Sequence, residues 1–178
     1  FTCLACIALL LTGCWAEEPP EQEDAFFIPD VTEDPAEPDV VLPRTFSLPY
    51  DAAQTLDPIT CSDGMQQVVG SLLYEGLFQL DPQLEPQPRL CSGYSYDSAA
   101  YTYTFTLRSG VTFSDGSPLT GADVAATLRR AVNSTRYGAR LNQVSSISYG
   151  ENTVTVALSS ANAHLPALLD IPIVKLGT

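Results

Sequence analysis

The chain has 178 residues, 45% of them hydrophobic, which is enough for one domain with a core of its own. Its formal net charge is −13, but ten of the 21 acidic residues lie between Glu17 and Asp39, ahead of the first basic residue, Arg44. From Arg44 onward, 11 acidic and 8 basic residues leave a balance of −3, which argues against the basic surface that nucleic-acid binding needs.

Residues 1–14 have the pattern of a lipoprotein signal peptide. Residues 3–11 form an apolar run of about nine, less than half of what a membrane-spanning helix requires, so we interpret them as the h-region of a signal. The run ends in Leu-Thr-Gly-Cys at residues 11–14, which resembles the lipobox of bacterial lipoproteins. The resemblance implies that Cys14 is acylated and that the protein is extracytoplasmic and lipid-anchored to the bacterial cell membrane. The alternative is a buried apolar segment that contains a cysteine.

Residues 15–43 have the composition of a disordered, acidic, proline-rich tether. Six prolines and ten carboxylates leave too little apolar surface to offset the entropy of ordering this segment. We therefore expect the folded part to be residues 44–178, held away from the membrane by the tether.

Two cysteines, Cys61 and Cys91, remain in the folded part. Outside the cytoplasm they could form a disulfide, and two buried free thiols are an equal alternative. Neither lies near a histidine in the sequence that could activate it, so the sequence does not indicate a nucleophilic cysteine.

The first half of the folded part predicts one strand, one helix and a loop. Residues 44–48 alternate weakly and indicate a strand. Apolar residues recur at helical spacing from Met65 to Leu73, and we expect this helix to end near Glu75 with Gly76 as its left-handed cap. Prolines between residues 81 and 88 indicate a loop.

The second half predicts further strands and helices. Tyr101, Tyr103, Phe105 and Leu107 alternate with Thr102, Thr104, Thr106 and Arg108, which places a strand at residues 101–108 with the first set on one face. Thr120 and Asp123 have the spacing of a capping box, so a helix should start at Thr120. The remaining expected elements are a short strand at 111–113, a turn at 115–116, strands at 144–149 and 153–158, and a short helix at 162–169. The fold class is therefore α+β, with several antiparallel strands and two or three helices.

An ordered set of motifs resembles the extracellular solute-binding proteins of family 5, which include oligopeptide-, dipeptide- and nickel-binding proteins. The motifs are Tyr-Glu-Gly-Leu at residues 74–77, Tyr-Thr-Phe at 103–105, Leu-Arg-Ser-Gly-Val-Thr-Phe at 107–113 and Asp-Gly-Ser-Pro-Leu-Thr-Gly-Ala-Asp-Val at 115–124. The resemblance implies a two-lobed type II periplasmic binding protein, of which this chain would hold the N-terminal part: part of lobe I with its added subdomain.

The resemblance also implies a function and a site. The protein would be the binding subunit of an ABC importer, capturing a peptide or other small solute and working with permease and ATPase subunits, with no catalytic residue, metal or cofactor. In this family the loop after the first strand approaches the ligand, and the matching residues here are Ile59, Thr60 and Cys61.

Three alternatives remain at this stage. The same family includes binders of nickel chelates and other small solutes, although a single histidine, His164, argues against direct metal ligation here. A surface sensor or adhesion lipoprotein could use the same fold without transport. A tethered hydrolase would need a nucleophile, a base and an orienting group, and the sequence shows no such constellation.

Overall fold

A computed structural model describes residues 45 and 47–178, and the account that follows concerns this part of the chain alone. The predicted signal peptide with Cys14 and the predicted tether at 15–43 lie outside the described residues. In chain order the elements are α1 (Gly64–Leu73), β1 (Phe78–Leu80), β2 (Pro86–Pro88), β3 (Cys91–Asp97), β4 (Thr102–Leu107), α2 (Gly121–Val132), η1 (Gly138–Leu141), β5 (Val144–Tyr149), β6 (Thr153–Leu158) and α3 (Leu165–Leu168). None of these helices is long and apolar enough to cross a membrane.

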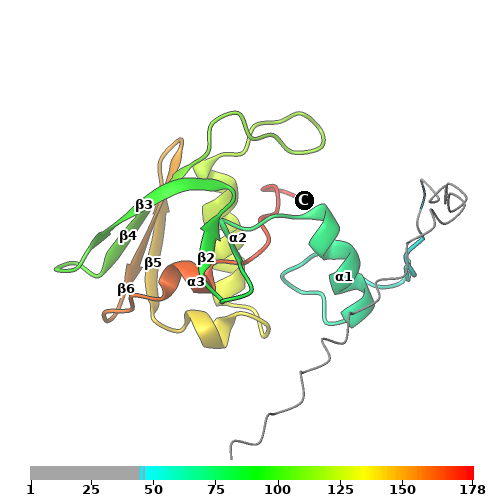
Figure 1. Ribbon diagram of the computed structural model, residues 1–178, viewed down its shortest axis with the longest axis horizontal. Coiled ribbons are helices and arrows are strands. Elements are labelled where there is room, and N and C mark those ends of the chain that lie inside the picture. The colour runs from blue at the N-terminus through cyan, green and yellow to red at the C-terminus, as the bar shows by residue number, and fades with distance from the viewer. Residues whose placement is uncertain (1–44, 46) are drawn as a thin grey trace, which may run out of the picture. The chain divides into compact units, whose positions relative to one another are not determined.

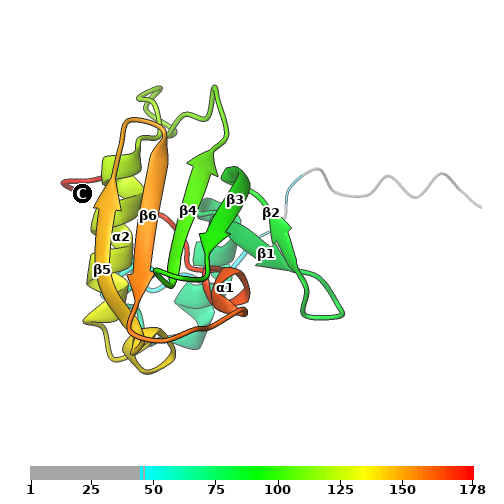
Figure 2. The ribbon, with the colours of Figure 1, turned by 90° about the vertical axis from the view of Figure 1, so that its left-hand side faces the viewer.

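A four-stranded antiparallel sheet in the order β3-β4-β6-β5 forms the centre of the described unit. Helix α2 packs along one face of this sheet, and β1 and β2 form a separate two-stranded ribbon beside it (Figures 1 and 2). The alternation predicted for β4 is confirmed for Tyr103, Phe105 and Leu107, which are all buried. It is wrong for Tyr101, which lies in the turn before β4 and is 39% exposed. The three buried residues join apolar residues of β6 and α2 in one hydrophobic cluster, which fixes the sheet against the helix.

Helix α2 begins where the sequence places it. Thr120 is the N-cap, and its hydroxyl and the Asp123 carboxylate bond reciprocally with the backbone, so the predicted capping box is present. The first residue, Gly121, lies against the turn between β5 and β6, with its N–H donating to Glu151 O at 3.1 Å. A Cβ at Gly121 would overlap Gly150 O and lie 2.6 Å from Thr153 O, so only glycine allows this approach.

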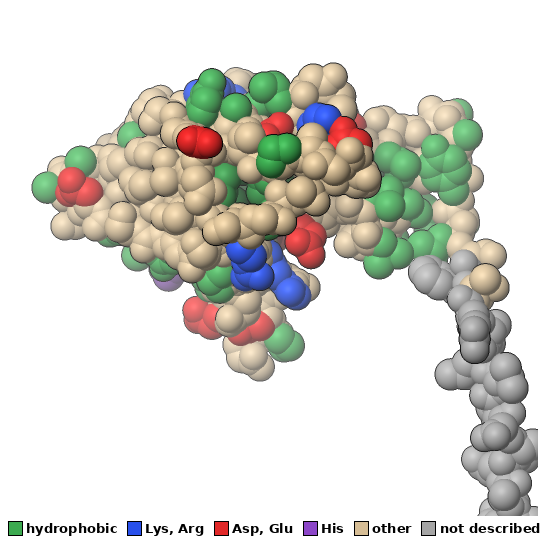
Figure 3. All heavy atoms as spheres, turned by 90° about the horizontal axis from the view of Figure 1, so that it is seen from above, with side chains coloured by type: hydrophobic (Ala, Val, Ile, Leu, Met, Phe, Trp, Pro, Cys, Tyr) green, Lys and Arg blue, Asp and Glu red, His purple; other side chains and the backbone are tan. Residues whose placement is uncertain are grey.

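Helix α1 forms as predicted but buries the opposite side. Its buried residues are Gln66 and Gly70, whereas the predicted apolar stripe is largely exposed, with Leu72 62% and Leu73 59% accessible. Figure 3 shows hydrophobic side chains gathered on the surface at the end of the unit where α1 lies. The predicted glycine cap is wrong: α1 ends at Leu73, and Gly76 lies in an extended segment bridged to Pro172.

Other elements differ from the sequence prediction at the edges of the sheets. The predicted strand at 44–48 is not formed by its described residues, Thr45, Ser47 and Leu48. The predicted loop at 81–88 contains the edge strand β2, where prolines are tolerated because no ladder N–H is required of them. The strand expected at 111–113 is a single bridge between Thr112 and Pro118. Strands β5 and β6 match their predicted ranges, while the helix expected at 162–169 is limited to α3.

Candidate functional site

The turn that precedes α1 carries the three residues expected to approach a ligand. Asp57 builds this turn: its carboxylate accepts from Ile59 N–H at 3.0 Å, and its carbonyl oxygen accepts from Cys61 N–H at 2.8 Å. An Asp side chain that accepts a hydrogen bond from the backbone N–H two residues later is a common way to stabilise a turn. The same carboxylate pairs with the guanidinium of Arg130, which ties the turn to α2.

These three side chains lie in different environments: the core, the solvent and a cavity. Ile59 is 2% exposed and belongs to the hydrophobic core, while Thr60 is exposed to solvent. Cys61 is buried and lines a cavity. Of the three, Cys61 is therefore the residue that the structure places at a concave site, and the ligand role of all three stays a prediction.

The cavity, about 330 Å³ in volume, lies between α1 and η1, and we refer to it as the α1–η1 cavity. The turn and α1 form one wall, the segment 136–140 forms the other, and the chain at 170–172 contributes further lining. The lining residues used below are Cys61, Gln66, Gly70, Arg136, Tyr137, Arg140 and Asp170.

Gln66 is the polar centre of the α1 wall. It is 1% exposed, and its Nε2 donates to Asp51 O at 2.7 Å and Gln54 O at 3.5 Å, which fixes the orientation of the amide. Its Oε1 is buried and has no hydrogen-bond partner among the described residues. A buried carbonyl oxygen without a donor is costly in a folded protein, and this one is closed to solvent, so it is not a contact that the cavity offers to a solute.

Tyr137 is the aromatic centre of the opposite wall. The guanidinium carbon of Arg140 lies 4.8 Å from the centre of its ring and that of Arg136 lies 5.1 Å away. The hydroxyl donates to Pro58 O at 3.3 Å, which connects this wall to the turn before α1. Burial raises the pKa of Tyr137, although the two arginines act in the opposite direction, so the phenol stays neutral and keeps its role as a donor.

Charge in the α1–η1 cavity is partly compensated. Arg140 pairs with Asp170 at 2.6 Å, and the Nε atom of Arg140 is buried without a partner among the described residues. Arg136 donates to Cys61 O at 3.2 Å and forms no ion pair with any described residue. The cavity thus offers the guanidinium of Arg136, which has no ion-pair partner among the described residues, and an aromatic face, a combination suited to binding a small polar solute.

Sequence reasoning missed Gln66, Arg136, Tyr137 and Arg140 as site residues. Arg136 follows α2 in the sequence and is exposed to solvent, so its residue type and position alone do not distinguish it from an ordinary surface arginine. The signal available was Arg-Tyr-Gly-Ala-Arg at residues 136–140, where two arginines flank an aromatic residue immediately after a helix.

The possible disulfide between Cys61 and Cys91 is not formed in the structure. Both residues are buried free cysteines, which is the other alternative left open by the sequence. The Cys61 thiol contacts Asp63 O at 3.6 Å ahead of α1, whereas Cys91 begins β3 opposite Leu107 of β4. The two cysteines therefore lie on different elements, one in the turn before α1 and the other at the start of β3. Burial raises the pKa of the Cys91 thiol.

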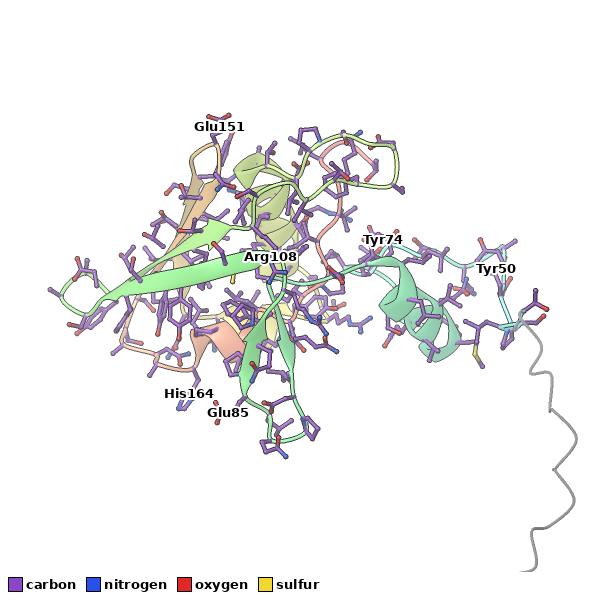
Figure 4. All side chains as sticks on the ribbon, turned by 45° about the horizontal axis from the view of Figure 1, so that its top comes forward. Tyr50, Tyr74, Glu85, Arg108, Glu151 and His164 are labelled. Carbon is purple, nitrogen blue, oxygen red and sulfur yellow. The ribbon has the colours of Figure 1, made fainter. Side chains whose placement is uncertain are left out.

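His164 lies away from the α1–η1 cavity. It is exposed at the start of α3, and Figure 4 shows it at the periphery of the unit, on a different element from Arg108. Within residues 47–178, His, Cys, Asp and Glu side chains do not gather into a group of three that could hold a metal ion.

With this geometry established, comparison with known proteins identifies the family. The model of the bacterial extracellular solute-binding proteins, family 5 Middle, matches residues 85–177, more than half of the chain. The chain belongs to the family 5 solute-binding proteins. The match begins in the β1–β2 ribbon and runs through the sheet and α2, and this membership confirms the resemblance found in the sequence.

Two curated relatives illustrate the similarity. The glutathione-binding protein GsiB of Salmonella paratyphi A is 38% identical over 107 residues, 59% of this chain and 21% of that protein. A probable peptide ABC transporter periplasmic-binding protein, y4tO of Sinorhizobium fredii, is 30% identical over 132 residues, 73% of this chain and 25% of that protein. The chain therefore spans about a fifth to a quarter of the length of these family 5 relatives.

A solved binding-protein structure shows a similar arrangement of elements. The binding protein AgaA from A. tumefacien R10, determined in complex with agropinic acid, aligns with a TM-score of 0.60 at 27% identity, covering 68% of this chain and 26% of its own. Together with the antiparallel sheets and helices described above, this confirms an α+β fold that corresponds to part of a type II periplasmic binding protein.

Proposed function

We propose that this family 5 protein is the solute-binding subunit of an ABC importer and that it captures a peptide or other small solute partly through the α1–η1 cavity. The observation that carries the proposal is a concave site of about 330 Å³ between α1 and η1, one wall of which presents Arg136 and Tyr137. The names of the relatives support the solute class, since one binds glutathione and another is a probable peptide-binding protein. Permease and ATPase subunits would receive the solute.

The proposed organisation follows the sequence. Residues 1–14 serve as the signal, Cys14 carries the lipid, residues 15–43 form the tether, and residues 44–178 form the N-terminal part of the binding domain. Lipidation is tested by mass spectrometry of protein extracted from membranes, with Cys14→Ala as the variant. We expect a diacylglycerol-modified Cys14 in the native protein and release of the variant from the membrane fraction. A native protein recovered without lipid would contradict the anchor.

The binding role is tested by thermal unfolding of the purified protein with pools of short peptides. A ligand that binds only the native state raises the midpoint, by an amount that grows with ligand concentration. If no pool raises the midpoint, peptide capture is wrong.

The place of binding is tested with a glycine that lines the cavity. A Cβ at Gly70 would meet no atom within 4 Å, so the side chain of Gly70→Leu is expected to occupy the cavity without straining α1. Gly64→Leu is the matched control, because Gly64 begins the same helix, also has open space and lies outside the cavity lining. We expect Gly70→Leu to abolish the peptide-induced rise and Gly64→Leu to keep it. An unchanged rise in Gly70→Leu would place the solute elsewhere.

A further inference from the structure

One edge of the four-stranded sheet is open to pairing with a further strand. Strand β5 is the last in the order β3-β4-β6-β5, and within the described residues no other strand bonds to its outer side (Figure 2). Its sequence, Val-Ser-Ser-Ile-Ser-Tyr, has no charged residue and no proline, which are two common means of protecting an edge strand. The register shift between Val144 and Ser146 affects only the start of the strand. Protection of the rest of this edge must therefore come from another element.

The backbone groups of Ile147 and Tyr149 face outward from the sheet. Gly150 N–H donates to Thr153 O at 2.9 Å, where β5 turns into β6. Bonding positions alternate along an antiparallel pair, so Ser148 also bonds to β6, whereas Ile147 and Tyr149 turn their N–H and C=O groups away from it. These outward groups are the ones to which an added strand would bond.

Arg129 of α2 covers the middle of this edge. One of its Nη atoms donates to Ile147 O at 2.6 Å, and its guanidinium carbon lies 5.7 Å from the centre of the Tyr149 ring. The side chain is exposed and forms no ion pair within residues 47–178, so no described carboxylate competes with β5 for it. An incoming strand would have to break this bond and remove a charge from water, and both steps oppose pairing.

Without this cover, the edge of β5 fits a second copy of itself. Tyr149 is 54% exposed at one end of the strand. At the other end, a hollow of about 240 Å³ lies between β5 and α2, lined by Arg129, Val132, Asn133 and residues 144–147. If two copies pair antiparallel with Ile147 opposite Ile147, Tyr149 of each copy lies opposite Ser145 of the other, beside the hollow. The two ends of β5 are therefore complementary across a two-fold axis, and the strand carries no charge that would repel its copy.

We propose that Arg129 keeps the protein monomeric by blocking antiparallel pairing of β5 with β5 of a second copy. The pairing would be centred on Ile147, whose carbonyl oxygen the guanidinium occupies. This surface is separate from the α1–η1 cavity, because neither Arg129 nor any residue of β5 lines that cavity. The inference is therefore independent of which solute the protein binds.

The test is sedimentation velocity of the purified protein over a concentration series, with Arg129→Ala as the key variant. Arg89→Ala is the matched control, because Arg89 is also exposed and forms no ion pair with a described residue, but it donates to Gln79 Oε1 at 2.6 Å in the β1–β2 ribbon. The double variant Arg129→Ala/Tyr149→Pro closes the edge again, since proline removes an outward N–H that makes no bond to β6. Amide hydrogen exchange of Ile147 and Tyr149, measured by NMR, locates the contact without a second substitution.

We expect the native protein and Arg89→Ala to be monomers, and Arg129→Ala to dimerise at least about tenfold more tightly than the native protein, the effect of one charge-assisted hydrogen bond. In this dimer, the Ile147 and Tyr149 amides should exchange more slowly as concentration rises, and the double variant should return to a monomer. A monomeric Arg129→Ala, a dimer without this protection, or a folded double variant that still dimerises would overturn the proposal. So would a native dimer, because Arg129 would then not block pairing.

Discussion

Gly121 allows a sharp test of how closely α2 packs on the β5–β6 turn. In Gly121→Ala the new Cβ would overlap Gly150 O and lie 2.6 Å from Thr153 O, where ordinary contacts are at least 3.0 Å. Because both obstacles are backbone atoms, the start of α2 must move away from the turn, at a typical overpacking cost of about 1–3 kcal/mol. The move also weakens the Gly121 N–H bond to Glu151 O, worth about 1 kcal/mol.

A gain opposes these costs, since alanine is a better helix former than glycine by up to about 1 kcal/mol. We therefore expect Gly121→Ala to lower the free energy of unfolding by about 2 kcal/mol. Gly64→Ala is the control, because Gly64 is also the first residue of a helix and has nothing within 4 Å of its Cβ position. It should be neutral or slightly stabilising. The assay is urea unfolding followed by circular dichroism, and equal stabilities of the two variants would refute the packing argument.

Three further predictions concern the core and the attachment of the C-terminal segment. Thr127→Val should destabilise the protein by about 1–3 kcal/mol in urea unfolding, because the buried Thr127 hydroxyl donates to Val174 O at 3.0 Å and accepts from Val174 N–H at 3.1 Å. Phe105→Ala should cost about 3–5 kcal/mol, since Phe105 is fully buried, and a smaller loss would mean that the cluster repacks. Burial raises the pKa of Asp123, but hydrogen bonds from the Thr120 hydroxyl and Leu176 N–H outweigh it and lower the pKa overall. The carboxylate therefore adds stability above its unfolded pKa of about 4, and this is lost as pH falls through the lower folded pKa. The stability difference between the native protein and Asp123→Asn should thus shrink from pH 6 to pH 2, and a constant difference would contradict the assignment.

The sequence predicted elements whose structure is decided locally. β4 alternates apolar and polar residues against a partner on each side, and the capping box of Thr120 and Asp123 marks the start of α2 within the helix itself. β5 and β6 are joined by a short turn, so their pairing needs no distant information. By contrast, β2 contains two prolines and pairs only at an edge, a context that local propensity does not reveal.

Helix α1 shows why periodicity alone does not give burial. The spacing of Met65, Val68 and Leu72 predicted a helix correctly, but the side turned toward the unit is the one with Gln66 and Gly70. The buried groups of α1 are therefore a glycine and a side-chain amide bonded to Asp51 O, and not the apolar stripe. A hydrophobic stripe shows which side of a helix is able to be buried. In α1 the residues of this stripe are not covered by the described part of the chain.

The candidate site depends on contacts between residues far apart in the sequence. Arg136 reaches the carbonyl of Cys61, and the hydroxyl of Tyr137 reaches that of Pro58, each across more than seventy positions. Family resemblance placed Cys61 near the ligand, but only the folded chain brings the arginines and the tyrosine opposite to it. The polar atom without a partner, Gln66 Oε1, is also invisible until its amide is seen to be fixed by Asp51.

The link between α1 and β1 has a consequence for the thermodynamics of capture. Tyr74 N–H donates to Gly70 O at 3.0 Å, Ile173 N–H donates to Glu75 O at 2.8 Å, and Leu90 N–H donates to Gly76 O at 3.3 Å. The backbone is therefore held by hydrogen bonds where it leaves the α1 wall of the cavity and leads into β1. Ordering a loop or side chain on binding costs roughly 0.5–1.5 kcal/mol for each group immobilised. Along this link that ordering accompanies folding, so the solute that we propose would meet a preorganised surface and its affinity would depend on how well it fits.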